Sequence, residues 1–185
     1  MTATINASTS SGVIVTSDTS GSLDIQSNGT SRLSVTSSGV SFTSAATAVP
    51  TFCAYLTANA TVTANTFVKI PFNATLFDTN SNFNTTTNRF LPTVAGYYQI
   101  NLIASNTAGT VLVAAIYKNG TIYQRGSQVD ATSGQYGAQL SLIIYFNGTT
   151  DYIEGWTYSS LTTINGGAPG TGLSCNFSGA MVRSA

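Results

Sequence analysis

Histidine is absent from the 185-residue chain, and charged residues are scarce. Without histidine, Ser-His-Asp and Cys-His nucleophilic systems, histidine-ligated metals and the usual general base are excluded. Six basic and six acidic residues give a formal net charge of zero, and charged residues make up 6% of the chain. A typical globular domain has about 25%. A surface built from Ser, Thr, Asn, Gln and Gly suits a protein largely covered by copies of itself or by a larger assembly.

Several other features that define classes of function are missing. The few basic residues are scattered, so no basic stripe for nucleic acid is expected. No run of about 18 apolar residues predicts membrane insertion. The N-terminal sequence MTATINASTSSG has neither the basic region nor the apolar core of a signal peptide, so we expect synthesis in a cytoplasm without the usual export. No phosphate-binding glycine loop is present, and we expect no cofactor.

The acidic residues offer no candidate catalytic pair. A glycosidase needs two carboxylates that face one cleft. Asp151 and Glu154 are three residues apart, and on a continuous strand they would point to opposite faces. We therefore expect that the protein is not an enzyme. A glycan-degrading enzyme that depends on Asp151 is the remaining catalytic alternative.

The composition changes near Pro50, which predicts two parts, residues 1–49 and 50–185. The first part is rich in Ser, Thr, Gly and Ala, and a weak ten-residue repeat runs through it: Val13-Ile14-Val15, Leu23-Asp24-Ile25 and Leu33-Ser34-Val35. Each unit is typical of a short strand followed by a glycine-containing turn. One copy cannot bury such narrow apolar faces, whereas three chains around an axis can, so we predict a trimeric β stalk or anchor. The alternative is a disordered Ser/Thr-rich linker.

The second part is dense in apolar and β-branched residues and shows no helical periodicity. Asn119-Gly120 and Asn147-Gly148 each separate two apolar-rich runs and predict two-residue hairpin turns. Many short strands at such spacing indicate an all-β sandwich or jelly roll. The expected strands are Phe52–Leu56, Phe67–Phe72, Arg89–Leu91, Gly96–Ser105, Val111–Lys118, Thr121–Gln124, Ala138–Phe146, Tyr152–Tyr158 and Ser174–Val182.

Six short motifs in residues 51–185 resemble one family in their order and spacing. They are Phe52-Cys53-Ala54, Ile70-Pro71-Phe72-Asn73, Arg89-Phe90-Leu91-Pro92, Gly96-Tyr97-Tyr98-Gln99-Ile100, Lys118-Asn119-Gly120 and Phe177-Ser178-Gly179. The family is the trimeric jelly roll of the complement-component-q globular head and the tumour necrosis factor superfamily. The resemblance implies a homotrimeric jelly-roll β-sandwich. The family's calcium-binding acidic residues have no evident counterpart here, and we expect no metal.

The resemblance also suggests residues of the trimer interface or core. It implies that Phe177 lies near the three-fold axis, where three aromatic rings can pack; the alternative is an ordinary core residue. Tyr98, Ile100 and Leu102 alternate along their expected strand and should share its inward face. Tyr98, Ile100 and Trp156 are therefore the other candidates for the interface or core. Trp156 shares a strand face with Tyr158, and the pair is alternatively a sugar-stacking platform.

The two cysteines, Cys53 and Cys175, are too few for a structural zinc site, which needs four ligands. We favour two small buried hydrophobic side chains. The first and last strands of the resembled fold are neighbours, so a disulfide is the alternative that the resemblance adds.

Residues 12–40, with the pattern SDTSG…L.IQ.NGT, resemble passages in structural proteins of tailed phages of marine and cyanobacterial hosts. This resemblance implies a virion location, with the N-terminal segment contacting other virion proteins. We predict a trimeric fibre or knob that contacts host surface polysaccharide or a receptor through the loops 125–137 and 165–172. The candidate receptor-facing residues are Arg125, Gln128, Asp130, Asn165 and Pro169. The alternative is a capsid decoration or cement protein that stabilises the head without binding a receptor.

Overall fold

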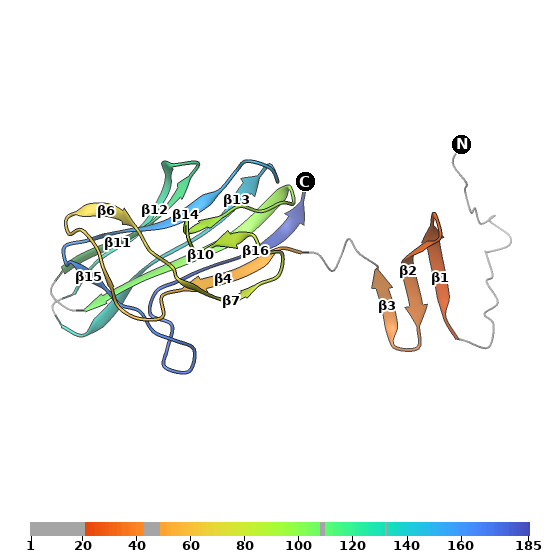
Figure 1. Cartoon of the computed structure of the whole chain (residues 1–185), viewed down its shortest axis with the longest axis horizontal. Helices are drawn as coiled ribbons and strands as arrows, with labels where there is room; N and C mark the ends of the chain where they lie inside the picture. The colour runs from red at the N-terminus through yellow and green to blue at the C-terminus, as the bar shows by residue number, and fades with distance from the viewer. Residues whose placement is uncertain (1–20, 43–48, 108–109, 132) are drawn as a thin grey trace. The chain divides into compact units, whose positions relative to one another are not determined.

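The computed structural model describes residues 21–42, 49–107, 110–131 and 133–185 (Figure 1). The chain divides into two units, Met1–Ala48 and Val49–Ala185, and each is considered by itself. The first copy of the ten-residue repeat, at Val13, lies outside the described residues. Within the described ranges every regular element is a β-strand, and no helix is long and apolar enough to span a membrane.

The N-terminal unit contains a three-stranded antiparallel sheet of β1 (Leu23–Ser27), β2 (Thr30–Thr36) and β3 (Gly39–Phe42). Leu23 pairs with Val35 and Val35 with Val40, so the apolar side chains gather on one face of the sheet. Leu23, Ile25, Val35 and Val40 are 36–60% exposed. A single three-stranded sheet has no second layer with which to bury such a face.

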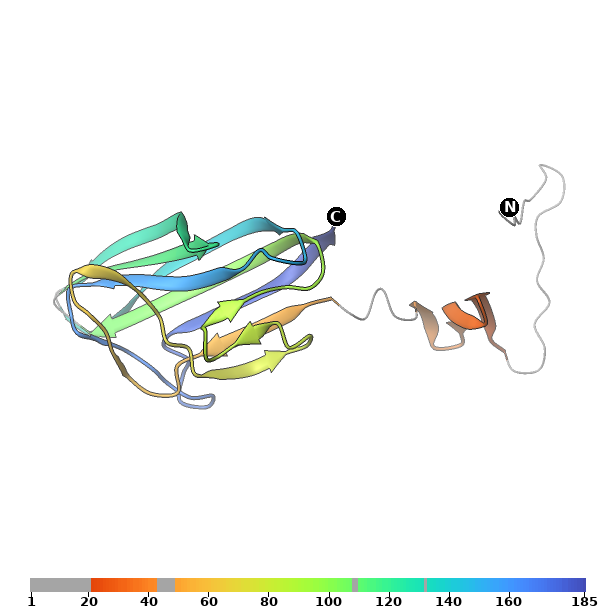
Figure 2. The same ribbon diagram turned by 45° about the horizontal axis from the view of Figure 1, so that its top comes forward.

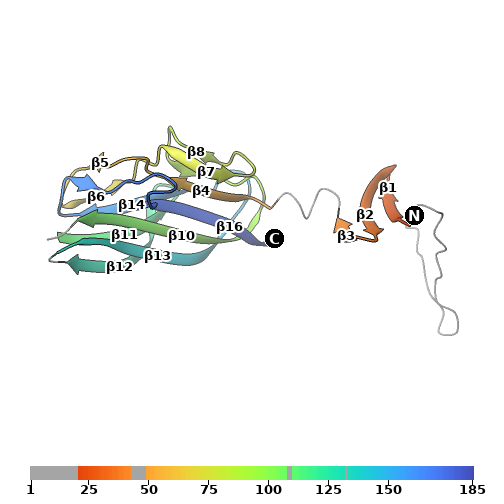
Figure 3. The same cartoon turned by 90° about the horizontal axis from the view of Figure 1, so that it is seen from below.

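The second unit, here called the head, consists of two main sheets. The five-stranded sheet has the order β13-β10-β16-β4-β7, with β4, β16, β10 and β13 side by side in Figure 3. The six-stranded sheet has the order β12-β11-β14-β9-β8, with β6 also paired to β14, and β15 pairs with β5. The strands are β4 (Thr51–Tyr55), β5 (Ala60–Thr61), β6 (Thr66–Lys69), β7 (Ala74–Asp78), β8 (Phe83–Asn84), β9 (Arg89–Phe90), β10 (Gly96–Thr107), β11 (Thr110–Lys118), β12 (Thr121–Ala131), β13 (Gln135–Phe146), β14 (Ile153–Ser159), β15 (Thr163–Ile164) and β16 (Asn176–Ser184).

All nine expected strands are present, with shifted ends, and four more accompany them. Three of these, β5, β8 and β15, have only two residues each and carry no alternation that a sequence can show. The fourth, β7, follows Asn73 and ends at Asp78, two residue types that are depleted in strands, and it was not among the expected strands. Strand β12 runs to Ala131, seven residues beyond its expected end at Gln124.

The two Asn-Gly pairs behave differently. Asn119 and Gly120 have φ values of 52° and 81° and form the predicted tight turn between β11 and β12. The hairpin predicted at Asn147-Gly148 is wrong, because β13 and β14 belong to different sheets and residues 147–152 cross between them. The Asn147 side-chain oxygen instead accepts hydrogen bonds from the backbone N–H groups of Thr149, Thr150 and Asp151.

The core lies between the two main sheets and is rich in aromatic rings. Phe177 contacts Phe52 edge-on, with ring centroids 5.1 Å apart, and stacks on Phe72 at 5.8 Å. Strand β10 contributes Tyr98 and Ile100 from its inward-facing positions. In Figure 2 the long green strand β10 runs beside the dark blue β16, which carries Phe177. The predicted alternation along β10 thus sets the inward face of the sandwich.

The cysteines are two separate free thiols. Cys175 belongs to the buried core, where its Sγ accepts a hydrogen bond from the backbone N–H of Ser105 at 3.1 Å. Burial raises the pKa of this thiol to about 11. Cys53 lies in β4 opposite Ser178 and Phe77, and burial raises its pKa as well. The interpretation as buried hydrophobic side chains therefore holds, and the disulfide alternative does not.

Candidate functional site

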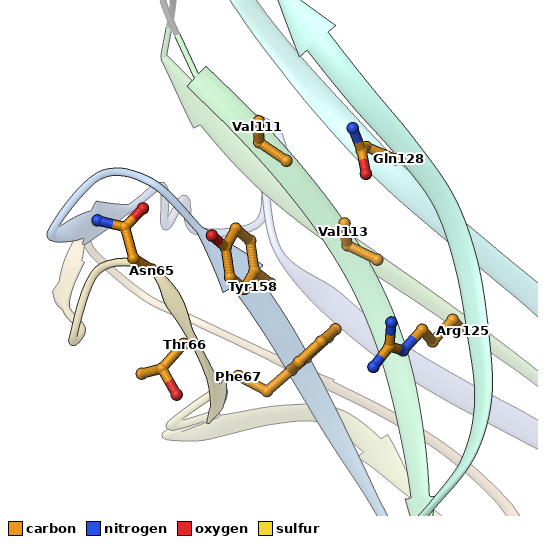
Figure 4. Close-up of a pocket in the computed structure, with 8 residues that line it drawn as sticks. All are labelled: Asn65, Thr66, Phe67, Val111, Val113, Arg125, Gln128 and Tyr158. Carbon is orange, nitrogen blue, oxygen red and sulfur yellow. The ribbon is translucent and has the colours of Figure 1, made fainter.

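The outer face of the six-stranded sheet carries a groove of about 600 Å³ (Figure 4). Ligand sites in proteins have volumes of roughly 300–1,000 Å³. Side chains from four strands and from the turn before β6 line this groove: Asn65, Thr66, Phe67, Val111, Val113, Arg125, Gln128 and Tyr158. We call it the Arg125 groove.

Strand register brings these distant residues together. In β14, Tyr158 pairs with Phe67 of β6 on one side and with Val113 of β11 on the other, and Val113 pairs with Gln128 of β12. Residues that are directly opposite in neighbouring strands point to the same face. The Phe67 and Tyr158 rings consequently lie 5.7 Å apart with an interplanar angle of 58°.

Arg125 supplies the only charge of the groove lining. A register shift between Val113 and Ala115 lets Arg125 pair with Ala115, and its guanidinium lies 4.9 Å from the centroid of the Phe67 ring. No carboxylate of the described residues forms an ion pair with Arg125. The groove lining therefore has a positive charge held against an aromatic ring and contains no acidic residue. The adjoining carboxylate of Asp130 accepts a hydrogen bond from Gln128 and forms no ion pair with Arg125.

A second cluster on the same sheet surrounds Trp156. The Trp156 ring stacks on Tyr117, with centroids 4.2 Å apart and an interplanar angle of 17°. Its Nε1–H donates to Glu154 Oε2 at 3.0 Å. Trp156 and Tyr158 share a strand face as predicted, but Trp156 does not line the Arg125 groove. The Trp156 ring packs against Tyr117, whereas the Tyr158 ring packs against Phe67.

Glu154 is the buried anion of this cluster, with an exposed fraction of 2%. Lys69 Nζ lies 3.1 Å and Arg89 Nε 2.8 Å from its Oε1 atom. Burial alone raises the pKa of this carboxyl, but the hydrogen bonds from Arg89, Trp156 and Lys69 outweigh burial and leave the pKa below its ordinary value. Glu154 therefore stays ionised and joins β6, β9 and β14.

Asp151 contacts residues outside the Glu154 cluster. Its Oδ1 accepts a hydrogen bond from Asn119 Nδ2 at 2.8 Å, and its Oδ2 lies 3.0 Å from Lys118 Nζ. The hydrogen bond from Asn119 is the main cause that lowers the pKa of this carboxyl. Asp151 and Glu154 thus belong to different ion pairs. Among the described residues, no group of three or more acidic or cysteine side chains is placed to bind a metal.

Three of the predicted receptor-facing residues lie in a strand instead of a loop. Arg125, Gln128 and Asp130 all belong to β12, because the apolar strand β11 pairs with this polar strand as far as Ala131. The structure brings Arg125 and Gln128 together in the groove, and Gln128 Nε2 donates to Asp130 Oδ2 at 3.2 Å. Within the predicted loop 125–137, residues 125–131 thus form the end of β12, and residues 135–137 begin β13 in the other main sheet.

The other two predicted receptor-facing residues, Asn165 and Pro169, lie apart from the groove. Asn165 is 7% exposed, and its backbone N–H donates to the carbonyl of Ser105 at 2.9 Å, so it cannot face a receptor. Pro169 is exposed in the segment between β15 and β16. Neither residue lines the Arg125 groove.

The suspected interface residues Tyr98, Ile100 and Phe177 are fully buried within one chain. They occupy inward-facing positions of β10 and β16 and pack within one chain, which favours the core alternative for Phe177 over a place at the three-fold axis. Trp156 lies half-buried on the outer side of the six-stranded sheet.

Sequence reasoning missed Phe67, Asn65 and Thr66 as lining residues of the groove. Phe67 was expected at the start of a strand, but periodicity alone does not say whether such a residue faces the core or solvent. The one available signal in the sequence was Asn65, because asparagine tolerates left-handed turn positions. In the structure Asn65 adopts a φ of 59° just before β6.

The outward side of the five-stranded sheet is the second notable surface, and we call it the tyrosine face. Tyr97, Ile143 and Tyr145 are 45%, 59% and 42% exposed there, and the two tyrosine rings lie 5.4 Å apart. The five strands of this sheet contain two charged residues, Asp78 of β7 and Arg183 of β16, and Arg183 lies opposite Tyr97. This sheet therefore exposes large apolar side chains on a nearly uncharged surface.

Comparison with known proteins identifies the fold. No family model and no curated protein matches the sequence. The globular domain of zebrafish complement 1qA is 15% identical, with a TM-score of 0.53 over 74% of this chain and 99% of that chain. Murine APRIL at pH 5.0 is 6% identical, with a TM-score of 0.54 over 72% and 99%. Eiger TNF from S. frugiperda is 7% identical, with a TM-score of 0.50 over 74% and 93%.

At these identities the likeness concerns the fold alone. It confirms the resemblance on which the sequence analysis relied, since the same two groups of proteins are found by structure. The head of this chain has the jelly-roll fold shared by complement 1q globular domains and tumour necrosis factor ligands.

Proposed function

We propose that this protein is a non-enzymatic, homotrimeric surface protein of a tailed-phage virion, in which the head is a knob and residues 1–49 form a stalk or anchor. The observation that carries the proposal is the tyrosine face. Soluble monomers rarely expose several large apolar side chains on a sheet with so few charges, whereas surfaces that associate are rich in aromatic residues and poor in charge.

Three features of the chain support self-association. Gln99 Nε2 donates to Ser141 Oγ at 2.8 Å, and Ser141 Oγ donates to Asn101 Oδ1 at 2.8 Å, so polar groups beside the tyrosines already have partners. Such groups lose little when a second surface covers them. The family that the head resembles is trimeric. The low overall charge removes the repulsion that keeps ordinary proteins apart.

The sheet of β1, β2 and β3 supports the stalk. Its apolar face around Ile25 and Val40 has no second layer within the described part of its own unit. Three copies that turn these faces inward would supply that layer. The virion location rests on the resemblance of residues 12–40 to tailed-phage structural proteins.

Solution mass tests the oligomeric part of the proposal. We expect light scattering after gel filtration to give about 57 kDa, three times the 19.1 kDa of one chain. A monomer at 19.1 kDa would overturn the trimeric knob and stalk. Antibody labelling of purified virions tests the location, and unlabelled particles would overturn it.

The same particles distinguish attachment from capsid decoration. If the knob contacts the host, particles that lack the protein adsorb less well to cells while their heads keep their stability. If the protein is a cement, particles that lack it lose head stability and adsorb normally. We favour attachment because the head carries the Arg125 groove.

A further inference from the structure

We propose that the Arg125 groove binds an acidic saccharide, with the guanidinium of Arg125 holding the carboxylate of a sugar. The inference deepens the proposed attachment role and rests on it for its biological setting. Binding itself requires only the head.

Charge selects an anionic ligand. Of the eight lining residues, Arg125 alone is charged, and no carboxylate of the described chain pairs with it. The other cations of this sheet already have acidic partners: Lys69 and Arg89 pair with Glu154, and Lys118 pairs with Asp151. A neutral sugar would leave Arg125 without a partner. A polyphosphate would find a single cation where it needs several.

The remaining lining groups select a ligand with hydroxyls and an apolar face. Asn65, Thr66 and Gln128 offer amide and hydroxyl groups along the edges of the groove (Figure 4). Phe67 and Tyr158 offer aromatic surface between them. A sugar ring presents hydroxyls at its rim and C–H groups on its faces, which is the mixture that such a lining can contact.

The groove is organised before any ligand arrives. Its side chains project from the paired strands β6, β11, β12 and β14, which are more rigid than loops. The Phe67 ring holds the Arg125 guanidinium in place at 4.9 Å. Less conformational freedom is therefore lost when Arg125 forms its fork of hydrogen bonds with a carboxylate.

The groove also stays accessible in the proposed trimer. It lies on the outer side of the six-stranded sheet, whereas the tyrosine face lies on the outer side of the other sheet of the sandwich. Three copies would present three grooves to one polysaccharide. Simultaneous contacts would raise the affinity for a polymer far above that for a single sugar.

The test uses matched ligands on the full-length chain. Hexamers of galacturonic, glucuronic and mannuronic acid are titrated by calorimetry beside their methyl esters, in which each carboxylate is neutral. We expect at least one acid to bind and its ester to bind about tenfold more weakly or worse, the loss expected for a hydrogen bond to a charged group. Added salt should weaken binding of the acid and leave the ester unaffected.

Variants locate the site. We expect Arg125→Gln to weaken binding about tenfold, and Arg125→Lys to lie between it and the unchanged chain, because lysine lacks the planar fork. Arg32→Gln removes the same charge from the N-terminal unit and should bind normally. Arg125 is exposed, so these variants should fold, and circular dichroism checks that they do.

Three outcomes would overturn the inference: none of the three acids binds, acid and ester bind equally, or Arg125→Gln binds as well as the unchanged chain. Light scattering of the same samples separates this result from the proposed function. A trimer that binds no acid overturns the groove alone, and a monomer that binds overturns the trimer alone.

Discussion

At Glu154, one buried carboxylate holds three strands of the six-stranded sheet together. Lys69 from β6, Arg89 from β9 and Trp156 from β14 all donate to it. Arg89 also lies over the Tyr152 ring at 4.1 Å, which extends the cluster to the loop before β14. Removing the charge would leave two cations beside a buried neutral group.

We expect Glu154→Gln to lower the free energy of unfolding at neutral pH by about 2 kcal/mol, the range for hydrogen bonds to a charged group. Because the pKa of Glu154 in the folded chain lies below its ordinary value of 4.5, its stabilisation is present above pH 4.5 and is lost as the pH falls through the lowered pKa. Urea unfolding of both chains between neutral and acidic pH measures this difference.

The difference between Glu154→Gln and the unchanged chain should shrink as the solution becomes acidic. Asp151 also has a lowered pKa and adds its own acid sensitivity to both chains, so the comparison isolates Glu154. A difference that stays constant with pH would show that the ionised form of Glu154 is not what stabilises the cluster.

Substitutions at Phe177 test whether this side chain stabilises the core. It is fully buried against Phe52, Phe72 and Phe83, so we expect Phe177→Ala to lower the free energy of unfolding by about 3–5 kcal/mol. Phe177→Leu fills more of the space and should cost less. Chemical denaturation measures both. Unchanged stability with a fall in oligomer mass would instead restore the axial role.

At the scale of elements, the loop 147–152 depends on a glycine. Gly148 has a φ of 73°, and a Cβ atom there would lie 2.5 Å from the backbone N of Ala95. Gly134 has a similar φ of 83°, but a Cβ there would meet nothing within 4 Å. A side chain at either position would be strained by the left-handed backbone. Only at position 148 would it also collide with a neighbouring segment.

We expect Gly148→Ala to lower the melting temperature clearly more than Gly134→Ala, because only the former must also push the loop away from Ala95. Left-handed strain alone costs roughly 1 kcal/mol. Differential scanning calorimetry of the two variants makes the comparison. Equal shifts would mean that the loop moves freely and that its contact with residues 94–95 is unimportant.

The elements themselves were largely predictable. Alternation along β10 and the turn at Asn119-Gly120 are local signals, and both appear as expected. The second half of β12, residues 125–131, and the strand β7 were not predicted, because only pairing with β11 and β4 shows that these segments are extended. Arg125 and Gln128 were chosen as polar loop residues, and their meeting with Phe67 followed from register.

At the scale of the whole molecule, the tyrosine face makes the most direct prediction. Ile143 is 59% exposed there, and a lysine at its place would put a charge into the proposed trimer contact. We expect Ile143→Lys to lower the mass by light scattering from about 57 kDa toward the 19.1 kDa of one chain.

The control is Ile122→Lys on β12, in the other sheet, where the same substitution replaces a 43% exposed isoleucine. It should leave the mass unchanged. Dissociation by both variants would point to a general loss of solubility or folding, and dissociation by neither would move the contact away from the tyrosine face.

The sequence by itself determined the all-β class and the low charge, because strand alternation, turn residues and composition are local properties of the chain. The jelly roll followed from the order of its motifs, which resembles that of a known family. Only the tertiary structure decided that Phe177 lies in the core and that Arg125 lies against Phe67, which is 58 positions away in the chain. The physical reason is register: a shift of one residue between paired strands turns every side chain to the opposite face, and no local pattern fixes which distant strands pair.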